Sequence, residues 1–312
     1  MEYSGEHSEV DSGSVRPGSS DNPLGFGCRG EQGTDPDDSM YGLEDVLDWS
    51  QPGQSSSQPE PSIEIYGLDH VLTRRIGRKV SRFTLKVKKL VIPRGTFCCI
   101  TGDNGCGKTT LLTIMGLLQR PSHVDRFVLH AGRGTKLQGF SIGELWNTRH
   151  GRRSIQLLRR RELGFVLQSG GLLESLTAAE NIEFVLRANG YKRMESRERI
   201  AKVCQPLGLT DKLRKSIPRC LSGGEQQIAA LARSVAHHPS LILVDEPTAS
   251  LHSKRANKTL TLLKQMQDQR GTDLTVVMVT HDQALAKKFG TFYVRLKADL
   301  DRNEGSVESI EG

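Results

Sequence analysis

The chain has 312 residues and a net charge of +7, and this length is enough for one large or two ordinary domains with buried cores. It contains no run of eighteen apolar residues, so it is not expected to cross a membrane unaided. The N-terminus MEYSGEHSEV carries acids where a signal peptide needs bases, which predicts a protein that stays in the cytoplasm. Six cysteines without metal-ligand spacing fit free thiols in a reducing compartment.

Charge is distributed unevenly along the chain. Residues 1–61 hold 13 of the 36 acidic and 2 of the 43 basic residues, and they are rich in Gly, Ser, Asp and Pro. We therefore expect a disordered acidic tail, although Met40, Leu43, Val46 and Leu47 at helical spacing leave open a short acidic helix that docks on a basic surface. The rest, with 41 basic and 23 acidic residues, suits anionic partners: nucleotide phosphates, anionic lipid or nucleic acid.

Strand and helix patterns alternate from residue 62 onward. Phe83, Leu85 and Val87 alternate with polar residues and predict a half-buried strand, residues 96–101 suit a buried central strand, and residues 111–118 lie on the helix after it. Further strands are predicted at 163–167, 241–244, 275–279 and 292–296, and further helices at 178–189, 196–207, 224–237, 254–269 and 282–289. This order predicts an α/β fold with a largely parallel sheet, helices on both faces and ligands at the carboxyl ends of the strands.

Residues 102–109, GDNGCGKT, fit the phosphate-loop pattern G-x-x-x-x-G-K-[ST] between a predicted strand and a predicted helix. The glycines let backbone N–H groups surround the phosphates, the helix N-terminus adds its dipole, and Lys108 supplies a positive charge. Thr109 is predicted to ligate magnesium through its hydroxyl, so the loop predicts a site for ATP with Mg²⁺. The residues predicted to bind the nucleotide here are Gly102, Asp103, Asn104, Gly105, Cys106, Gly107, Lys108, Thr109 and Thr110.

Two further segments carry chemistry. Residues 241–246, LILVDE, predict an apolar strand that ends in Asp245, which can hold the magnesium shell, and Glu246, which can orient or deprotonate the attacking water. Residues 221–227, LSGGEQQ, predict a Ser-Gly-Gly turn that opens a helix and forms a second anion site. Two anion sites at one sheet edge indicate an arrangement of two molecules.

With these segments, Gln168 in GFVLQ and His281 in VMVTHD in the same order, the chain resembles the ATP-binding subunits of ABC (ATP-binding cassette) proteins. It is most similar to ATPases of the lipoprotein-release, macrolide-export and cell-division group. The resemblance implies a P-loop NTPase of ABC-type architecture, with a mainly parallel sheet core, an N-terminal antiparallel β part and a small helical subdomain at about 169–222. The ABC domain is expected at 62–297, followed by a short C-terminal tail at 298–312.

The resemblance also implies a head-to-tail homodimer or heterodimer of cassettes. ATP would lie between the phosphate loop of one subunit and Ser222, Gly223 and Gly224 of the other. It further implies that magnesium is held by Thr109, Gln168 and Asp245. The catalytic residues that it implies are Glu246 as the base, His281 as a contact to the γ-phosphate, and Gln168.

The function implied is ATP hydrolysis that powers a membrane transport or extraction complex, with integral-membrane transport subunits as partners and a location on the cytoplasmic face of the membrane. One alternative is a soluble ABC ATPase without a transport role, which the basic body favours. Another is a degenerate regulatory cassette paired with an active one. A nucleic-acid partner is not expected, because neither a second cassette nor a long heptad run occurs.

The pattern departs from the family at several positions. His252 stands where the family carries an aspartate near the dimer interface, and Ile228 stands where an arginine often follows the signature glutamines. The aromatic that stacks on adenine is expected near Leu72, which is not aromatic, and Tyr66 is out of register. We therefore expect the base to lack a stacking contribution of roughly 1 kcal/mol.

Cys106 lies within the phosphate loop, beside a helix N-terminus and Lys108. This environment predicts a lowered pKa for the Cys106 thiol, and it predicts that oxidation or alkylation there blocks ATP binding. The alternative is that Cys106 is a tolerated small residue.

Overall fold

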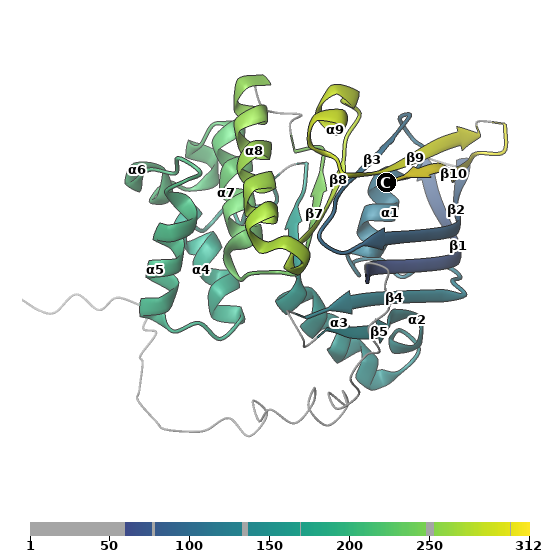
Figure 1. Cartoon of the computed structure of the whole chain (residues 1–312), viewed down its shortest axis with the longest axis horizontal. Coiled ribbons are helices and arrows are strands. Elements are labelled where there is room, and N and C mark those ends of the chain that lie inside the picture. The colour runs from purple at the N-terminus through teal and green to yellow at the C-terminus, as the bar shows by residue number, and fades with distance from the viewer. Residues whose placement is uncertain (1–59, 77–78, 133–136, 169, 248–252, 300) are drawn as a thin grey trace, which may run out of the picture. The chain divides into compact units, whose positions relative to one another are not determined.

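The computed structural model describes residues 60–312 except 77–78, 133–136, 169, 248–252 and 300 (Figure 1). The predicted acidic tail up to residue 59, its short helix and His252 therefore lie outside the described residues. The strands are β1 (Pro61–Ile76), β2 (Lys79–Pro93), β3 (Phe97–Gly102), β4 (Arg126–Ala131), β5 (Gln138–Ser141), β6 (Leu163–Val166), β7 (Leu241–Asp245), β8 (Thr275–Val279), β9 (Phe292–Asp299) and β10 (Glu304–Glu311). The helices are α1 (Lys108–Met115), α2 (Ile142–Leu145), α3 (Arg149–Glu162), α4 (Ala178–Ala188), α5 (Arg193–Cys204), α6 (Asp211–Arg214), α7 (Gly223–Ala236), α8 (Ser253–Arg270) and α9 (Gln283–Phe289), with short 3-10 turns η1 (Pro218–Cys220) and η2 (Gly271–Asp273).

The strands form one ten-stranded sheet in the order β5-β4-β1-β2-β10-β9-β3-β8-β7-β6. The run from β9 through β3, β8 and β7 to β6 is parallel throughout. Every residue of β7 and β8 is buried, because alternate side chains such as Val244 and Met278 enter a core shared with α7, α8 and α9, while Leu243 packs near α1 on the other face. Burial on both faces explains the continuous apolar runs in the sequence, and the predicted α/β fold is confirmed.

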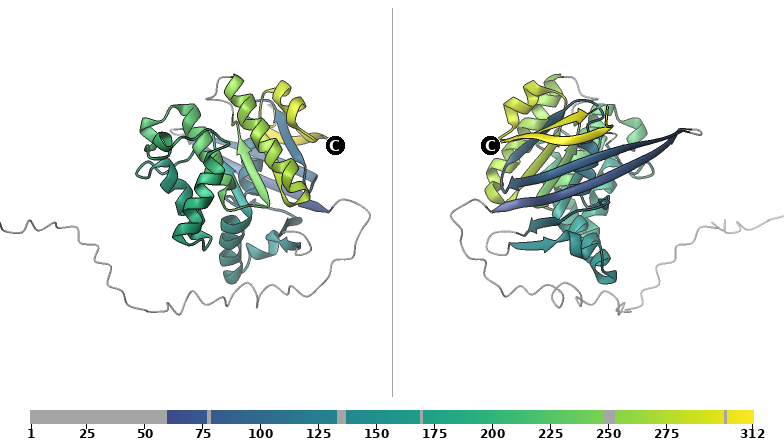
Figure 2. Two further views of the ribbon diagram at one scale, coloured as in Figure 1. Left: turned by 60° about the vertical axis from the view of Figure 1, so that its left-hand side comes forward. Right: turned by 90° about the vertical axis from the view of Figure 1, so that its right-hand side faces the viewer.

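The other half of the sheet is mainly antiparallel, as the sequence predicts for the N-terminal part. β1 and β2 form a long hairpin (Figure 2), and β4 and β5 extend the sheet from β1. The sequence predicts a short tail at 298–312, and the boundary at 297 is wrong, because β10 pairs with β9 on one side and β2 on the other. A Cβ on Gly305 would lie 2.2 Å from the carbonyl oxygen of Cys106, so this strand packs directly against the phosphate loop.

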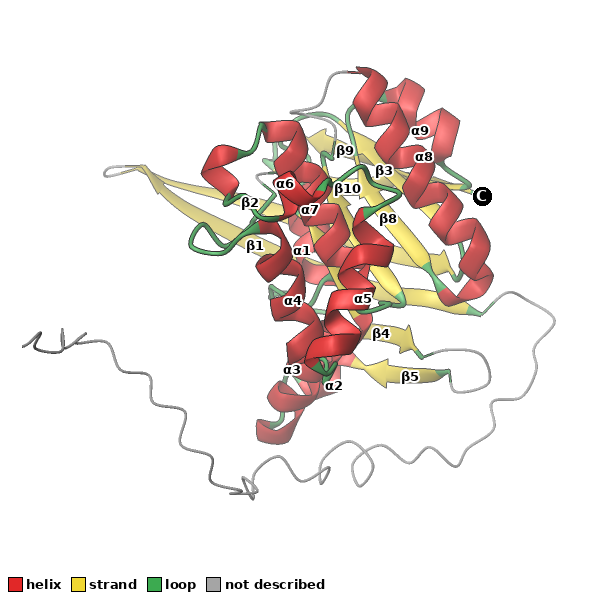
Figure 3. Cartoon of the chain, turned by 90° about the vertical axis from the view of Figure 1, so that its left-hand side faces the viewer, coloured by secondary structure: helices red, strands yellow, loops and turns green. Residues whose placement is uncertain are grey.

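A layer of helices lies beside the parallel half of the sheet (Figure 3). α4 and α5 pack on α7 through buried Ile182, Leu186, Ile200 and Val203. The described residues between Gln168 and Ser222 form helices and loops and no strand, which is the composition expected for the predicted helical subdomain. Among the described residues, no helix is both long and apolar enough to cross a bilayer.

Candidate active site

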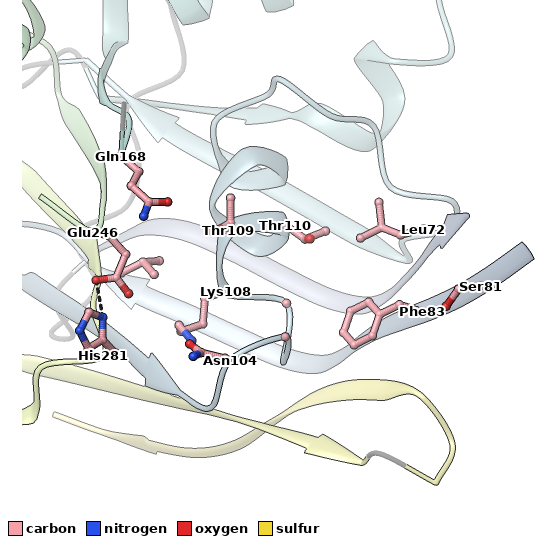
Figure 4. A pocket seen from close by; sticks show the side chains of 13 residues that line it. Leu72, Ser81, Phe83, Asn104, Lys108, Thr109, Thr110, Gln168, Glu246 and His281 are labelled. Carbon is pink, nitrogen blue, oxygen red and sulfur yellow. Dashed lines mark hydrogen bonds and ion pairs between the residues drawn. The ribbon is translucent and has the colours of Figure 1, made fainter. Parts of the chain in front are cut away.

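A pocket of about 710 Å³ lies at the carboxyl ends of the parallel strands (Figure 4). It brings together side chains that follow β3, β6, β7 and β8, as expected for a parallel sheet. Its lining residues are Leu72, Ser81, Phe83, Asn104, Gly105, Gly107, Lys108, Thr109, Thr110, Gln168, Glu246, Val279 and His281.

The phosphate loop connects β3 to α1 at the floor of this pocket. Gly107 has φ 95° and caps α1, and a Cβ there would lie 3.0 Å from Leu85 and 3.2 Å from Phe83, so only glycine fits. The Nζ of Lys108 donates hydrogen bonds of 2.8 Å to the carbonyl oxygens of Gly102 and Asp103. The ammonium group is thereby held inside the loop, where it neighbours the amides of the first turn of α1 and favours an anion.

Thr109 and Asp245 meet at the end of β7. The Oγ1 of Thr109 donates a 3.3 Å hydrogen bond to Oδ1 of Asp245. Burial raises the pKa of the Asp245 carboxyl above its ordinary value, and the hydrogen bond from Thr109 and the charge of Lys108 act in the opposite direction. A buried carboxylate with a hydroxyl at its side is a pair of hard oxygen ligands that suits a small divalent cation.

Glu246 and His281 form the wall opposite the phosphate loop. The Nδ1–H of His281 donates a 2.8 Å hydrogen bond to Oε2 of Glu246, whose side chain is 14% exposed against 66% for His281. The backbone of Glu246 is left-handed, with φ 45°, and its N–H donates to the carbonyl of Val279 at 3.0 Å. Such a conformation costs on the order of 1 kcal/mol in a residue other than glycine, and here it turns the carboxylate toward His281.

Gln168 reaches the pocket from the loop after β6, and this loop is tied to α7. The Nε2 of Gln227 donates a 2.9 Å hydrogen bond to the carbonyl of Gln168. The guanidinium of Arg233 donates to the carbonyls of Gly171 at 2.6 Å and Gly170 at 3.1 Å. Neither Gln227 nor Arg233 is among the residues predicted for the site, because each acts on backbone that is distant in sequence.

The signature turn Ser222-Gly223-Gly224 starts α7 but does not line this pocket. The Oγ of Ser222 accepts from the N–H of Glu225 at 3.4 Å, and Glu225 Oε2 accepts from the N–H of Ser222 at 2.8 Å. This reciprocal capping fixes the turn and leaves the first N–H groups of α7 available to an anion. One chain thus carries both predicted anion sites but brings only the first of them to the pocket.

An aromatic side chain, Phe83, lines the pocket, although the sequence predicts no aromatic partner for the adenine base. Leu72 lies in the pocket as predicted, and Phe83 is its direct cross-strand partner in the β1–β2 hairpin. Tyr66 pairs with Lys89, whose Nζ lies 5.9 Å from the centre of the tyrosine ring, and it is absent from the lining. The sequence does not indicate Phe83, because pairing between two strands, and not spacing along one strand, brings its ring to the pocket.

The predicted lowering of the pKa of the Cys106 thiol is wrong. Its side chain is fully buried behind the loop and lines neither this pocket nor the neighbouring one, and burial raises the pKa of the thiol. The charge of Lys108, whose Nζ lies 4.0 Å from Sγ, lowers the pKa by less than burial raises it. Asp103 also lies outside the main pocket and lines an adjacent one of about 770 Å³ that shares Asn104 and His281 with it.

The site has a glycine loop with an inward lysine, and this loop lies between a buried parallel strand and a helix. The acidic end of a nearby strand faces it. This arrangement defines a P-loop nucleoside triphosphatase. The family model described as ABC transporter matches residues 85–249. The chain belongs to the ABC transporter family, in which it is an ATP-binding cassette and an ATPase.

Relatives and solved structures agree with this membership. The chain is 37% identical over 203 residues to the lipoprotein-releasing system ATP-binding protein LolD of Aquifex aeolicus, covering 65% of this chain and 83% of the relative. It is 33% identical over 223 residues to the macrolide export ATP-binding/permease protein MacB of Hyphomonas neptunium, covering 72% of this chain and 31% of the relative. A dimeric structure of the cassette MJ0796 of Methanocaldococcus jannaschii aligns with TM-score 0.64 and 31% identity over 80% of this chain and 97% of that chain. A post-hydrolysis dimer of the same cassette, bound to ADP and Pi, aligns with TM-score 0.62 and 30% identity at the same coverage.

Proposed function

We propose that two cassettes associate head to tail, and that each ATP lies between the phosphate loop of one subunit and the Ser222-Gly223-Gly224 turn of the other. The observation that supports this proposal is that the two predicted anion sites of one chain do not lie in the same pocket. The pocket contains the phosphate loop, Gln168, Glu246 and His281 but not the capped signature turn. A second subunit can supply that turn, and the solved structures of MJ0796 are dimers.

The donor set fits magnesium. Thr109 and Asp245 present oxygens 3.3 Å apart, and Gln168 lines the same pocket as Thr109, with Asp245 directly behind Thr109. The described residues contain no cluster of three His, Cys, Asp or Glu suited to a metal, but an ion that accompanies nucleotide phosphates needs only one or two protein carboxylates. Bound there, Mg²⁺ would neutralise charge that develops on the phosphates.

Glu246 and His281 would then act on the γ-phosphate. In this proposal, the Glu246 carboxylate orients the attacking water and accepts its proton, and the hydrogen bond from His281 holds that carboxylate in place. His281 is the more exposed partner of the pair, so its ring can contact the γ-phosphate when ATP fills the pocket. Lys108 and the loop amides would hold the phosphates during this step.

We further propose that the cassette powers a membrane transport or extraction complex. A groove of about 270 Å³ runs beside α4, and Phe184, with 58% of its surface exposed, and Arg233 are among its lining residues. Arg233 also donates hydrogen bonds to the carbonyls of Gly170 and Gly171. A partner that displaced Arg233 in this groove would therefore move the loop that carries Gln168. A membrane subunit docked here would be linked to the nucleotide pocket through a short series of direct contacts.

The experiment is to purify the Glu246→Gln variant from detergent-solubilised membranes with MgATP and to identify the proteins that accompany it. Slowed hydrolysis should hold the closed dimer on its partners, whereas a Lys108→Ala variant, which cannot close around ATP, serves as the control. Recovery of a multi-span membrane protein with the first variant and not with the second is the expected result. Recovery of soluble protein alone, with none of the cassette in the membrane fraction, would instead favour a soluble ABC ATPase.

A further inference from the structure

Helix α3 presents an arginine surface that the ATPase site does not use. Its sequence is RHGRRSIQLLRRRE, and the only acid in it is the half-buried Glu162 at its last position. Ile155 and Leu158 are buried against the domain. The helical spacing places Arg149, Arg152 and Arg153, together with Arg160 two turns further on, on the face opposite Leu158. We call these four residues the α3 arginine face.

The charges of this face are not neutralised within the part of the chain that the structure describes. All four arginines are exposed, and among the described residues none of their guanidinium groups takes part in an ion pair or a side-chain hydrogen bond. The helix is anchored independently of them, because the Oγ1 of Thr148 caps it by accepting from the N–H of Gly151 at 2.9 Å. Four guanidinium groups therefore face solvent from a rigid support, and each can bind a phosphate oxygen pair.

The arginine face adjoins exposed apolar surface. Arg160 lines the same groove as Phe184, so the face continues into the groove beside α4. The end of α4 and the start of α5 carry further exposed basic side chains, at Arg187, Lys192 and Arg193. Figures 1, 2 and 3, which are turned about one vertical axis, all place α3 at the lower margin of the folded domain.

We propose that the α3 arginine face binds the anionic headgroups of a phospholipid bilayer. Guanidinium groups pair with the lipid phosphates, and Phe184 in the adjoining groove suits the boundary between headgroups and acyl chains. Duplex nucleic acid fits this surface less well, because large exposed apolar side chains gain nothing beside a phosphate backbone. The contact requires no other protein, so it can be tested in the absence of a membrane subunit.

The test uses the full-length chain alone, sedimented with vesicles of phosphatidylcholine with or without phosphatidylglycerol. The test variant is Arg149→Gln/Arg152→Gln/Arg153→Gln, which keeps helix propensity nearly constant. The control is Lys88→Gln/Lys212→Gln/Lys258→Gln, which removes the same charge from other elements where these side chains are exposed. Thermal unfolding and basal ATPase activity of both variants should match the wild type.

The wild type and the control should bind the anionic vesicles and not the neutral ones, and the test variant should bind on the order of 100-fold more weakly, because each arginine near an anionic surface contributes roughly a fivefold factor. Binding should also fall as salt is raised. Equal weakening in both variants would assign the effect to net charge and overturn the proposal. Failure of the wild type to bind the anionic vesicles, with or without arginine-dependent binding of a DNA or RNA duplex, would also overturn it. Neither result bears on whether a membrane subunit docks in the groove, so failure here is distinct from failure of the proposed function.

Discussion

The side-chain amide of Gln227 donates a 2.9 Å hydrogen bond to the backbone carbonyl of Gln168, so the helix that starts at the signature turn holds the loop that enters the pocket of the same chain. Gln227 is only 3% exposed, so the donor end of this hydrogen bond is buried. In a head-to-tail dimer, α7 would contact the partner's ATP at its N-terminus and its own chain's site through Gln168. In that dimer the helix would connect the two nucleotide sites.

Replacing Gln227 with leucine is expected to lower kcat about tenfold and to raise the magnesium concentration needed for half-maximal activity, with ATP affinity changed less than about twofold. The reason is that loss of this hydrogen bond leaves the carbonyl of Gln168 without its partner, at a cost of about 1 kcal/mol, and frees the loop that positions Gln168. Steady-state ATPase assays against ATP and against Mg²⁺ measure this. The exposed residue Gln205, changed to leucine, serves as the control and should behave as the wild type. If the Gln227→Leu variant needed the same magnesium concentration as the wild type, Gln227 would not position Gln168.

Maleimide should leave the ATPase of a Cys28→Ser/Cys220→Ser variant active, because the Cys106 thiol is fully buried and its raised pKa keeps it protonated at neutral pH. Of the cysteines in the described residues, Cys220 alone is exposed and should react. Mass spectrometry of the treated Cys28→Ser variant, in which the cysteine of the N-terminal segment is absent, locates the label. If maleimide modified Cys106 in the folded protein and ATP binding were lost, the expected protection would be contradicted and the reactivity predicted from the sequence would hold.

The Asp245→Asn variant should have a higher Tm than the wild type without nucleotide, while losing most ATPase activity. The raised pKa of Asp245 means that its protonated form favours folding. This stabilisation is fully present below the pKa of the unfolded chain and is lost as pH rises through the folded pKa. The Tm gain at neutral pH should therefore shrink as pH is lowered. Scanning calorimetry at several pH values, with the exposed Asp301→Asn as control, checks this, and a lower Tm than wild type at neutral pH would contradict it.

Phe83 is expected to contribute to nucleotide affinity. Phe83→Ala should weaken ATP binding about fivefold, corresponding to roughly 1 kcal/mol for loss of an aromatic contact, with kcat little changed. Isothermal titration with ATP measures the effect. Tyr66→Ala is the matched control because that ring lies outside the pocket lining. If Tyr66→Ala weakened binding and Phe83→Ala did not, the base would lie elsewhere.

The parallel core and the phosphate loop could be predicted because their signals are local. Residues 241–244 and 275–279 are apolar throughout, since both of their faces are buried, and β7 and β8 lie where the sequence places them. The loop at 102–109 is defined by glycines whose conformations are specific to it, such as Gly107 with φ 95°. Nearly all the residues that line the pocket from this core were predicted from these signals and from the resemblance.

Other elements carry weaker sequence signals. The sequence patterns predict no helix or strand between residues 118 and 163, although α3 forms there. The buried face of α3 carries few large apolar residues, Ile155 and Leu158 among them, and the many arginines around them give no clear helical pattern. β10 is polar on alternate positions and becomes a strand because β2 and β9 both pair with it. The position of Phe83 and the burial of Cys106 depend on strand pairing and on packing around the loop, and neither can be read from neighbours in sequence.

The composite ATP site is tested most directly by mixing two defective chains in the Glu246→Gln background, one carrying Lys108→Ala and the other Ser222→Glu. Each variant alone should stay monomeric with MgATP, because every site of its dimer would be damaged. The mixture should form a 1:1 heterodimer that holds one ATP, since one intact phosphate loop then faces one intact signature turn, and native mass spectrometry would detect it. Absence of the heterodimer, or ATP-dependent dimers of the Ser222→Glu chain alone, would contradict a site shared between two subunits.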